Sequence, residues 1–230
     1  MKALTAVPSH LVKVYSIIVS LACCSAAQAA FTANLVVNGN LETGDLTGWT
    51  TTNDMEVLDD PGATTRGSAG LAPGASVGRY SFYGGIGDAI ATATQTVSLF
   101  PFSVDIDSGT QDFALGVALQ SRFAVGAADT ARATFRFQDA GGNLLGSELS
   151  FVDPPTGAFD WTEFSQTGIV PVGTRQLFIE VDSRRTQFNS SDAYIDNVSF
   201  SLTSAIPEPS SFIVLGTMLC GSMFLRRRTA

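Results

Sequence analysis

The stretch AYIDNVSF, which spans Ala193–Phe200, decides the fold. Ala193 and Ile195 share one parity along the chain, whereas Val198 and Phe200 share the other. Side chains of a regular strand alternate between two faces, so both pairs can face one core only if an extra residue is inserted. The pattern therefore predicts a strand over Tyr194–Leu202 with a β-bulge near Asp196-Asn197, and a bulge re-aims a side chain, here that of Asp196.

Short alternating runs recur throughout the middle of the chain, separated by Gly, Asp, Asn and Pro. Ala131–Phe137 alternates, Asp139–Asn143 predicts a turn, and Leu144–Phe151 reads as the returning strand of a hairpin. The other predicted strands are Leu35–Val37, Tyr80–Tyr83, Ala91–Val97, Phe102–Ile106, Ala114–Leu119, Trp161–Gln166 and Gln176–Asp182. Many short strands at this spacing are typical of an all-β sandwich.

Three of these segments carry a family resemblance. Asn34–Glu42 with the following Gly48-Trp49, Ala93–Val97 and Ala193–Phe200 resemble, in this order, the opening, Q-x-V and closing strands of the galactose-binding-like jelly roll. Many carbohydrate-binding modules share that fold. The resemblance implies a jelly-roll β-sandwich with a carbohydrate-binding-like domain over residues 30–204.

The same resemblance implies a structural calcium ion, because Glu42 and Asp196 occupy positions that help to hold calcium in such modules. Carboxylate and carbonyl oxygens are the ligands that calcium prefers. The alternative is that Glu42 is a loop residue and that Asp196 only accepts hydrogen bonds from the backbone. A second acidic group, formed by Asp105, Asp107 and Asp112, is interpreted as a solvated strand end.

Residues 1–29 read as a secretory signal peptide. Lys2 and Lys13 flank a short apolar core, and Ala27-Gln28-Ala29 is an A-x-A cleavage site for signal peptidase. The apolar run is too short to span a membrane well. A lipoprotein cleavage before Cys23 is a weaker alternative, because Ser20 occupies a place that normally takes an aliphatic residue.

Residues 205–230 combine three features in order. Pro207-Glu208-Pro209 is followed by the apolar run Phe212–Leu225, and Arg226, Arg227 and Arg228 close it. This tail resembles the PEP-CTERM sorting signal of Gram-negative bacteria, which an exosortase is thought to cleave. The resemblance implies transient anchoring in the inner membrane, then release to the cell surface or extracellular matrix, and an association with exopolysaccharide or biofilm.

The composition of the middle excludes several classes of function. Between residues 30 and 204 there is no His, Cys or Lys, and the segment contains about 8 Arg compared with about 20 Asp and Glu. Such an acidic surface disfavours nucleic acid. Without imidazole or thiolate, zinc sites and the usual nucleophile–base pairs are missing. A glycosidase active site needs only two carboxylates and is formally possible, but we expect that this protein is not an enzyme.

Two hypotheses for the function remain open. The first is a non-catalytic matrix protein that binds polysaccharide, with Tyr80, Tyr83 and Tyr194 as candidate stacking residues. The second is a structural or adhesive domain with protein partners and no sugar site. Trp49 and Trp161 are expected in the core rather than in a binding site.

Overall fold

The computed structural model describes residues 31–59, 78–124, 127–155, 160–186, 191 and 193–203. The predicted signal peptide with Ala27 and Ala29, and the tail with its Pro-Glu-Pro motif and Arg triplet, lie outside the described residues. Within the described ranges, no helix is both long and apolar enough to cross a membrane.

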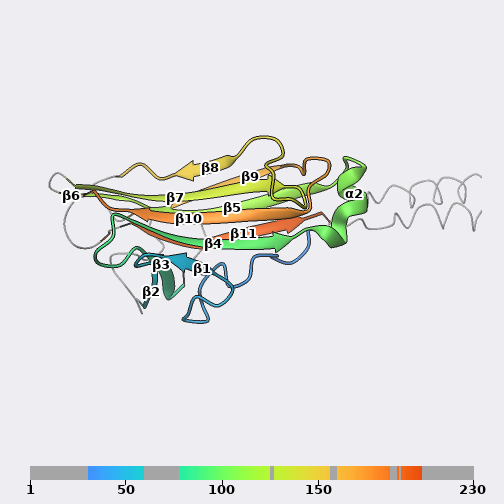
Figure 1. Cartoon of the computed structure of the whole chain (residues 1–230). Coiled ribbons are helices and arrows are strands. Elements are labelled where there is room, and N and C mark those ends of the chain that lie inside the picture. Colours follow the sequence, from blue (N-terminus) through green and yellow to red (C-terminus); the bar gives the residue numbers. More distant parts are fainter. Residues whose placement is uncertain are drawn as a thin grey trace, which may run out of the picture. The chain divides into compact units, whose positions relative to one another are not determined.

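Two antiparallel sheets stack face to face (Figure 1). The six-stranded sheet has the order β1-β4-β10-β7-β6, with β8 also pairing with β7. Its strands are β1 (Thr50–Thr52), β4 (Ile90–Ser98), β6 (Arg122–Ala124), β7 (Ala127–Gln138), β8 (Leu149–Val152) and β10 (Gln176–Arg184). The five-stranded sheet has the order β2-β3-β11-β5-β9, formed by β2 (Glu56–Asp59), β3 (Tyr80–Tyr83), β5 (Asp112–Gln120), β9 (Thr162–Ile169) and β11 (Tyr194–Leu202). This is the predicted jelly-roll sandwich.

The core lies between the two sheets. It is formed by the side chains that face inward as burial alternates along the strands. Burial along β4 switches at almost every residue, so that Ala91, Ala93 and Val97 face inward. Phe82, Phe135 and Phe200 are completely buried and come from both sheets. Trp49 packs edge-on against Phe82, with ring centroids 4.9 Å apart, which confirms its predicted core position.

The predicted bulge in β11 is confirmed. Residues Tyr194 to Asp196 and Ser199 to Leu202 pair with β5 in two registers, and the register shifts between Asp196 and Ser199. Asn197 adopts the left-handed conformation, with φ 53°, which asparagine tolerates better than most residues. Ile195 and Val198 can therefore both face the core, as the parity break required.

Two predicted strands are wrong. The Phe102–Ile106 region forms a 3₁₀ turn, η1 (Phe100–Phe102), and the short helix α2 (Ser103–Asp107). Pro101 lies at the first turn, where its missing N–H costs nothing, and of α2 only Ile106 is buried. Asp105 and Asp107 therefore lie on this helix rather than at a strand end, and Asp107 pairs with Arg175 at 2.7 Å.

Leu35–Val37 is the second wrong strand. Two of its three backbone amides are used by side chains instead of by a neighbouring strand. Val36 N–H donates to Asn34 Oδ1 (3.0 Å), and Val37 N–H donates to Gln95 Oε1 (2.8 Å). The segment still lies against β11, because Leu35 N–H donates to the carbonyl of Phe200 at 2.8 Å.

Candidate functional site

Asp196 lies at the bulge of β11 and is fully buried. Its Oδ1 accepts a hydrogen bond from the Asn197 N–H at 2.6 Å, whereas Oδ2 is buried with no hydrogen-bond partner. Burial raises the pKa of Asp196 well above its ordinary value; the Asn197 N–H works against this rise, and the nearby charge of Glu42 adds to it. A buried oxygen without a partner is costly, by about 1–3 kcal/mol.

Glu42 reaches this place from the loop that follows the N-terminal segment. Its Oε1 accepts hydrogen bonds from the backbone N–H groups of Arg79 (2.8 Å) and Tyr80 (3.1 Å) at the start of β3. The charge of Glu42 therefore lies close enough to raise the pKa of Asp196 further. Backbone hydrogen bonds do not account for the whole Asp196 carboxylate, because its Oδ2 accepts none.

The loop that carries Glu42 is fixed against the bulge. The Val198 N–H donates to the carbonyl of Gly39 at 2.9 Å. A Cβ atom at Gly39 would lie only 2.0 Å from the carbonyl oxygen of Val198, so glycine is required for this close approach. The preceding residue supplies a second buried oxygen without a partner, Asn38 Oδ1.

These oxygens fit a hard cation. Calcium takes six to eight oxygen ligands, from carboxylates, amides and backbone carbonyls. The candidate ligands are the carboxylates of Glu42 and Asp196 and the buried amide oxygen of Asn38. Within the described part of the chain, no three His, Cys, Asp or Glu residues gather in a group that could hold a metal. A cation at this place would therefore need backbone oxygens or water as well.

The three candidate stacking residues do not form one platform. Tyr80 is half-buried and packs against the main core, on the inner side of β3. Tyr83 and Tyr194 stack on the outer side of the five-stranded sheet, with ring centroids 5.7 Å apart. Tyr194 has the outward direction expected from its parity, but it is only 6% exposed, because it lies in a second small cluster with Trp161 and Ala118. Its ring therefore has no open face.

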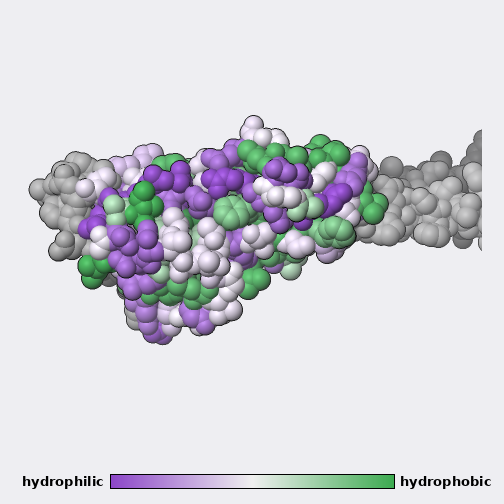
Figure 2. Space-filling model, viewed as in Figure 1, coloured by the Kyte–Doolittle hydropathy of each residue, from purple (hydrophilic) through white to green (hydrophobic). Residues whose placement is uncertain are grey.

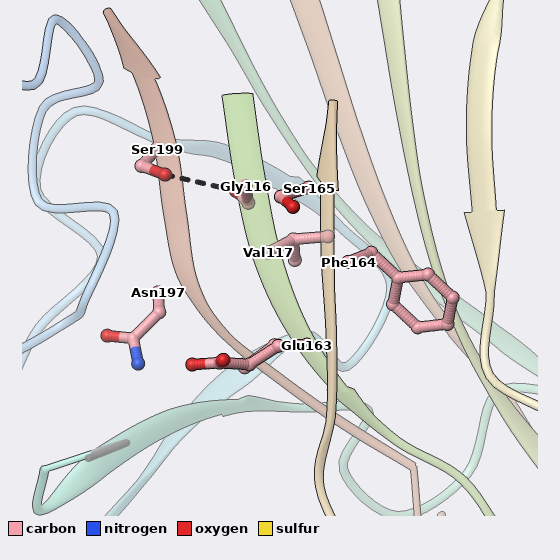
Figure 3. Close-up of a pocket in the computed structure, with 8 residues that line it drawn as sticks. Gly116, Val117, Glu163, Phe164, Ser165, Asn197 and Ser199 are labelled. Carbon is pink, nitrogen blue, oxygen red and sulfur yellow. Dashed lines mark hydrogen bonds between the residues drawn. The ribbon is translucent and has the colours of Figure 1, made fainter. Parts of the chain in front are cut away.

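The same side of the sheet holds a groove of about 260 Å³ that sequence reasoning missed (Figure 3). Its floor is Gly116 and Ala118 of β5. Its walls are Asn197 and Ser199 of β11, and Glu163 and Ser165 of β9. Cross-strand register explains this arrangement, since Gly116 pairs with Ser199 on one side and with Ser165 on the other.

Gly116 keeps the floor of the groove low. A Cβ atom there would lie 3.0 Å from Ser199 Oγ, which donates to the carbonyl of Gly116 at 3.3 Å. The Glu163 carboxylate and the Asn197 amide project into the same space, whereas the ring of Phe164 points away from it (Figure 3). A glycine in the interior of an apolar strand was the one sequence signal that could have revealed this groove.

The outer face of the six-stranded sheet is occupied by an ion-pair network. Arg132 bonds Asp182 at 2.5 Å and Glu180 at 3.4 Å, and Arg136 links Glu180 to Glu148 at 3.3 and 2.7 Å. Asp182 is fully buried and also pairs with Arg184. These charges neutralise one another. The charged residues on this face are therefore explained by their ion pairs within the sheet.

No family model matches the chain, and no curated protein matches it. The fold is similar to the enzymatically active domain of tailspike protein 4 of bacteriophage CBA120, with a TM-score of 0.51 and 21% identity over 74% of this chain. This chain spans only 21% of that tailspike chain. The likeness shows the fold.

Carbohydrate-binding modules are also similar in structure. TmCBM61 in complex with β-1,4-galactotriose has a TM-score of 0.48 and 17% identity, and the match covers 74% of this chain and 98% of that one. The CBM22-1 xylan-binding domain from Paenibacillus barcinonensis has a TM-score of 0.44 and 12% identity, with 79% and 100% covered.

Proposed function

We propose that this domain is a non-catalytic carbohydrate-binding module of an exported bacterial envelope protein. The observation that supports this proposal is the polar groove across β11, β5 and β9, with Gly116 on its floor and Glu163 and Asn197 on its walls. Of the solved modules named above, one is in complex with β-1,4-galactotriose and the other is a xylan-binding domain. The proposal takes from them only the class of ligand, a carbohydrate.

The groove chemistry suits sugar hydroxyls. Each hydroxyl both donates and accepts hydrogen bonds, and the walls offer the acceptor carboxylate of Glu163, the amide of Asn197 and the hydroxyls of Ser165 and Ser199. The small floor residues allow a flat ring to approach the sheet closely. Binding by a few such polar groups in a shallow site is weak per site, as expected for a protein that associates with a polymer of many repeats.

The absence of a second acid argues against catalysis in this groove. Hydrolysis of a glycosidic bond normally requires two carboxyl groups, about 5–10 Å apart on either side of the bond. Among the described residues that line the groove, Glu163 is the one acid. A single carboxylate can hold a hydroxyl but cannot divide the acid and base roles.

Calcium is part of the proposal, as a structural ion held by Glu42 and Asp196. It would neutralise the repulsion between the two carboxylates and give Asp196 Oδ2 a ligand. The ion would also connect the N-terminal loop to the closing strand of the domain.

Export and release complete the proposal. Signal peptidase removes residues 1–29, the tail anchors the chain transiently in the inner membrane, and an exosortase cuts near Pro207-Glu208-Pro209. The protein then associates with exopolysaccharide at the cell surface or in the matrix. These steps rest on the sequence motifs alone.

The full chain, tested on a glycan array and then by calorimetry, checks the binding function. We expect Glu163→Gln and Gly116→Val to weaken binding tenfold or more, the second by filling the floor. Thr167→Ala is the matched control, since Thr167 follows the groove on the same side of β9 and does not line it. Binding to no glycan, or equal binding by all variants, would favour the adhesive domain with protein partners.

A further inference from the structure

Six of the ten large apolar side chains that are exposed in the described residues lie at one end of the sandwich. These side chains, which we call the apolar tip, are Phe31, Phe100, Val104, Leu144, Ile169 and Val172. Val104 is 80% exposed, although it lies on a helix, where an apolar residue normally faces the core. Scattered single apolar residues are ordinary, but a group of them marks an interaction surface.

Contacts place these residues at the same end. Val172 approaches Gly109, which follows α2, and the Gly173 N–H donates to Asp107 of α2 at 3.3 Å. Ile169 pairs with Asp112, the first residue of β5. In Figure 2, hydrophobic residues appear around the end of the domain that carries α2.

Both ends of the described domain leave from this tip. Phe31 and Thr203 form an antiparallel bridge. The Thr203 N–H donates to the carbonyl of Asp112 at 3.0 Å, which places Thr203 beside the strand pair that contains Ile169. An anchor on the segment that leaves either end of the domain therefore keeps the apolar tip close to that anchor.

The apolar run of the tail begins at Phe212, nine residues after Thr203. Nine extended residues span at most about 30 Å, so an anchored tail keeps the tip within about that distance of the bilayer surface. The opposite end lies one length of β4 further along the domain, nine residues or about 30 Å, so the anchored tail constrains its distance from the bilayer less. The tip is thus the part of the domain that the anchor brings to the lipid.

We propose that the apolar tip docks onto the lipid surface while the tail anchors the chain. This inference rests on the anchoring described under the proposed function. Phe100, Val104 and Val172 insert among the headgroups, as the apolar faces of peripheral proteins do. Asp105 and Asp112 lie near the same end, so the preferred surface is zwitterionic, and anionic lipid weakens docking by repulsion.

The test uses the full chain with Cys23, Cys24 and Cys220 replaced by serine and one fluorophore on an introduced cysteine. Val104→Cys reports on the tip. Ile86→Cys is the matched control, because Ile86 is a 68% exposed apolar residue in the β3–β4 connection at the other end. Vesicles of phosphatidylcholine carry brominated acyl chains as the quencher, and flotation isolates the anchored chains.

We expect at least threefold stronger quenching at position 104 than at position 86, and a smaller difference when phosphatidylglycerol is added at low salt. Chains that float but show equal quenching at both positions overturn tip docking and leave the anchor intact. Chains that do not float overturn the anchoring and, with it, the docking. Cross-linking between two copies through position 104 without quenching would identify a second copy as the partner and overturn the lipid proposal.

Discussion

The carboxyl group of Asp196 lies fully buried beside the charge of Glu42, although the two residues come from opposite ends of the domain sequence. The pKa of Asp196 is raised, first by burial and further by this charge. A site of this kind is unfavourable for an ionised aspartate, and a bound cation would reverse that.

Calcium should therefore raise the melting temperature of the chain relative to chelator. An ion that binds only the folded state adds RT ln(1 + [L]/Kd), about 2.7 kcal/mol at a hundredfold excess over Kd. Asp196→Asn should remove the calcium effect, and in chelator it should be at least as stable as wild type, because it buries no charge. Differential scanning calorimetry with and without calcium measures both effects.

Asp182→Asn is the control for this experiment. Asp182 is also fully buried, but it pairs with Arg132 and Arg184. The loss of these charge-assisted hydrogen bonds costs about 1.5–3 kcal/mol, so this variant should melt lower in both buffers and keep the full calcium shift. Wild-type melting that is identical in calcium and chelator would leave Asp196 without a metal role.

Gly39→Ala should destabilise the domain by about 1–3 kcal/mol, the usual cost of overpacking. The added methyl group would lie 2.0 Å from the Val198 carbonyl oxygen, so the loop or the bulge must move. Gly109→Ala is a useful comparison, since its Cβ meets nothing closer than 3.7 Å, although its φ of 73° brings some strain. Urea denaturation of both variants measures the difference; equal losses would mean that the close approach at Gly39 costs no more than the strain at φ of Gly109.

Asp153 makes a pH-dependent contribution to the free energy of unfolding. Burial raises its pKa, and hydrogen bonds from Thr162 and Ser121, including the Ser121 N–H at 2.7 Å, only partly offset the rise. The folded state therefore holds the proton more tightly than the unfolded state, whose pKa is near 3.8. This contribution is fully present below that value and is lost as pH rises toward the folded pKa.

Asp153→Asn removes this titration. The free energy of unfolding of wild type minus that of the variant should decrease as pH rises above about 4, and it should level off once the folded carboxyl group is ionised. Urea denaturation of both proteins between pH 3.5 and 7 tests this. A difference that grows with pH would show that the hydrogen bonds dominate and that the pKa is lowered.

Processing should occur at both ends of the chain. Intact mass spectrometry of protein from its native envelope should show a first residue near Ala30 and loss of the Arg226–Arg228 triplet. Retention of the whole tail on mature protein would indicate a permanent anchor instead.

Two strands were predicted with their observed bounds. Tyr80–Tyr83 and Tyr194–Leu202 match β3 and β11 at both ends, and the bulge followed from parity alone. Phe102–Ile106 alternated equally well but lies in a connection at the tip, where Val104 remains exposed. Alternation cannot distinguish a strand from a short helix that buries a single side chain. The three-residue strands β1 and β6 were too short to show any pattern.

The two candidate sites also differ in how far the sequence could predict them. Glu42 and Asp196 belong to recognisable motifs and could be named from the sequence. The groove depends on which residues of β11 and β9 oppose Gly116, and that register is a property of the folded sheet. For Tyr194, the alternation along the strand predicted the outward direction of the side chain. It could not predict the cluster of side chains that covers the ring.

The closing strand β11 carries Asn197 and Ser199 in its groove wall and then ends at Leu202, beside the residue from which the tail departs. Under the proposed function, part of the tension between a polymer held in the groove and an anchor on the tail would therefore run along the axis of β11. The pairs of Ser199 to Leu202 with β5 would be loaded in shear and would have to break together, rather than one after another as in peeling. Under the proposed function, this arrangement would resist mechanical pulling between the bound polysaccharide and the anchored tail.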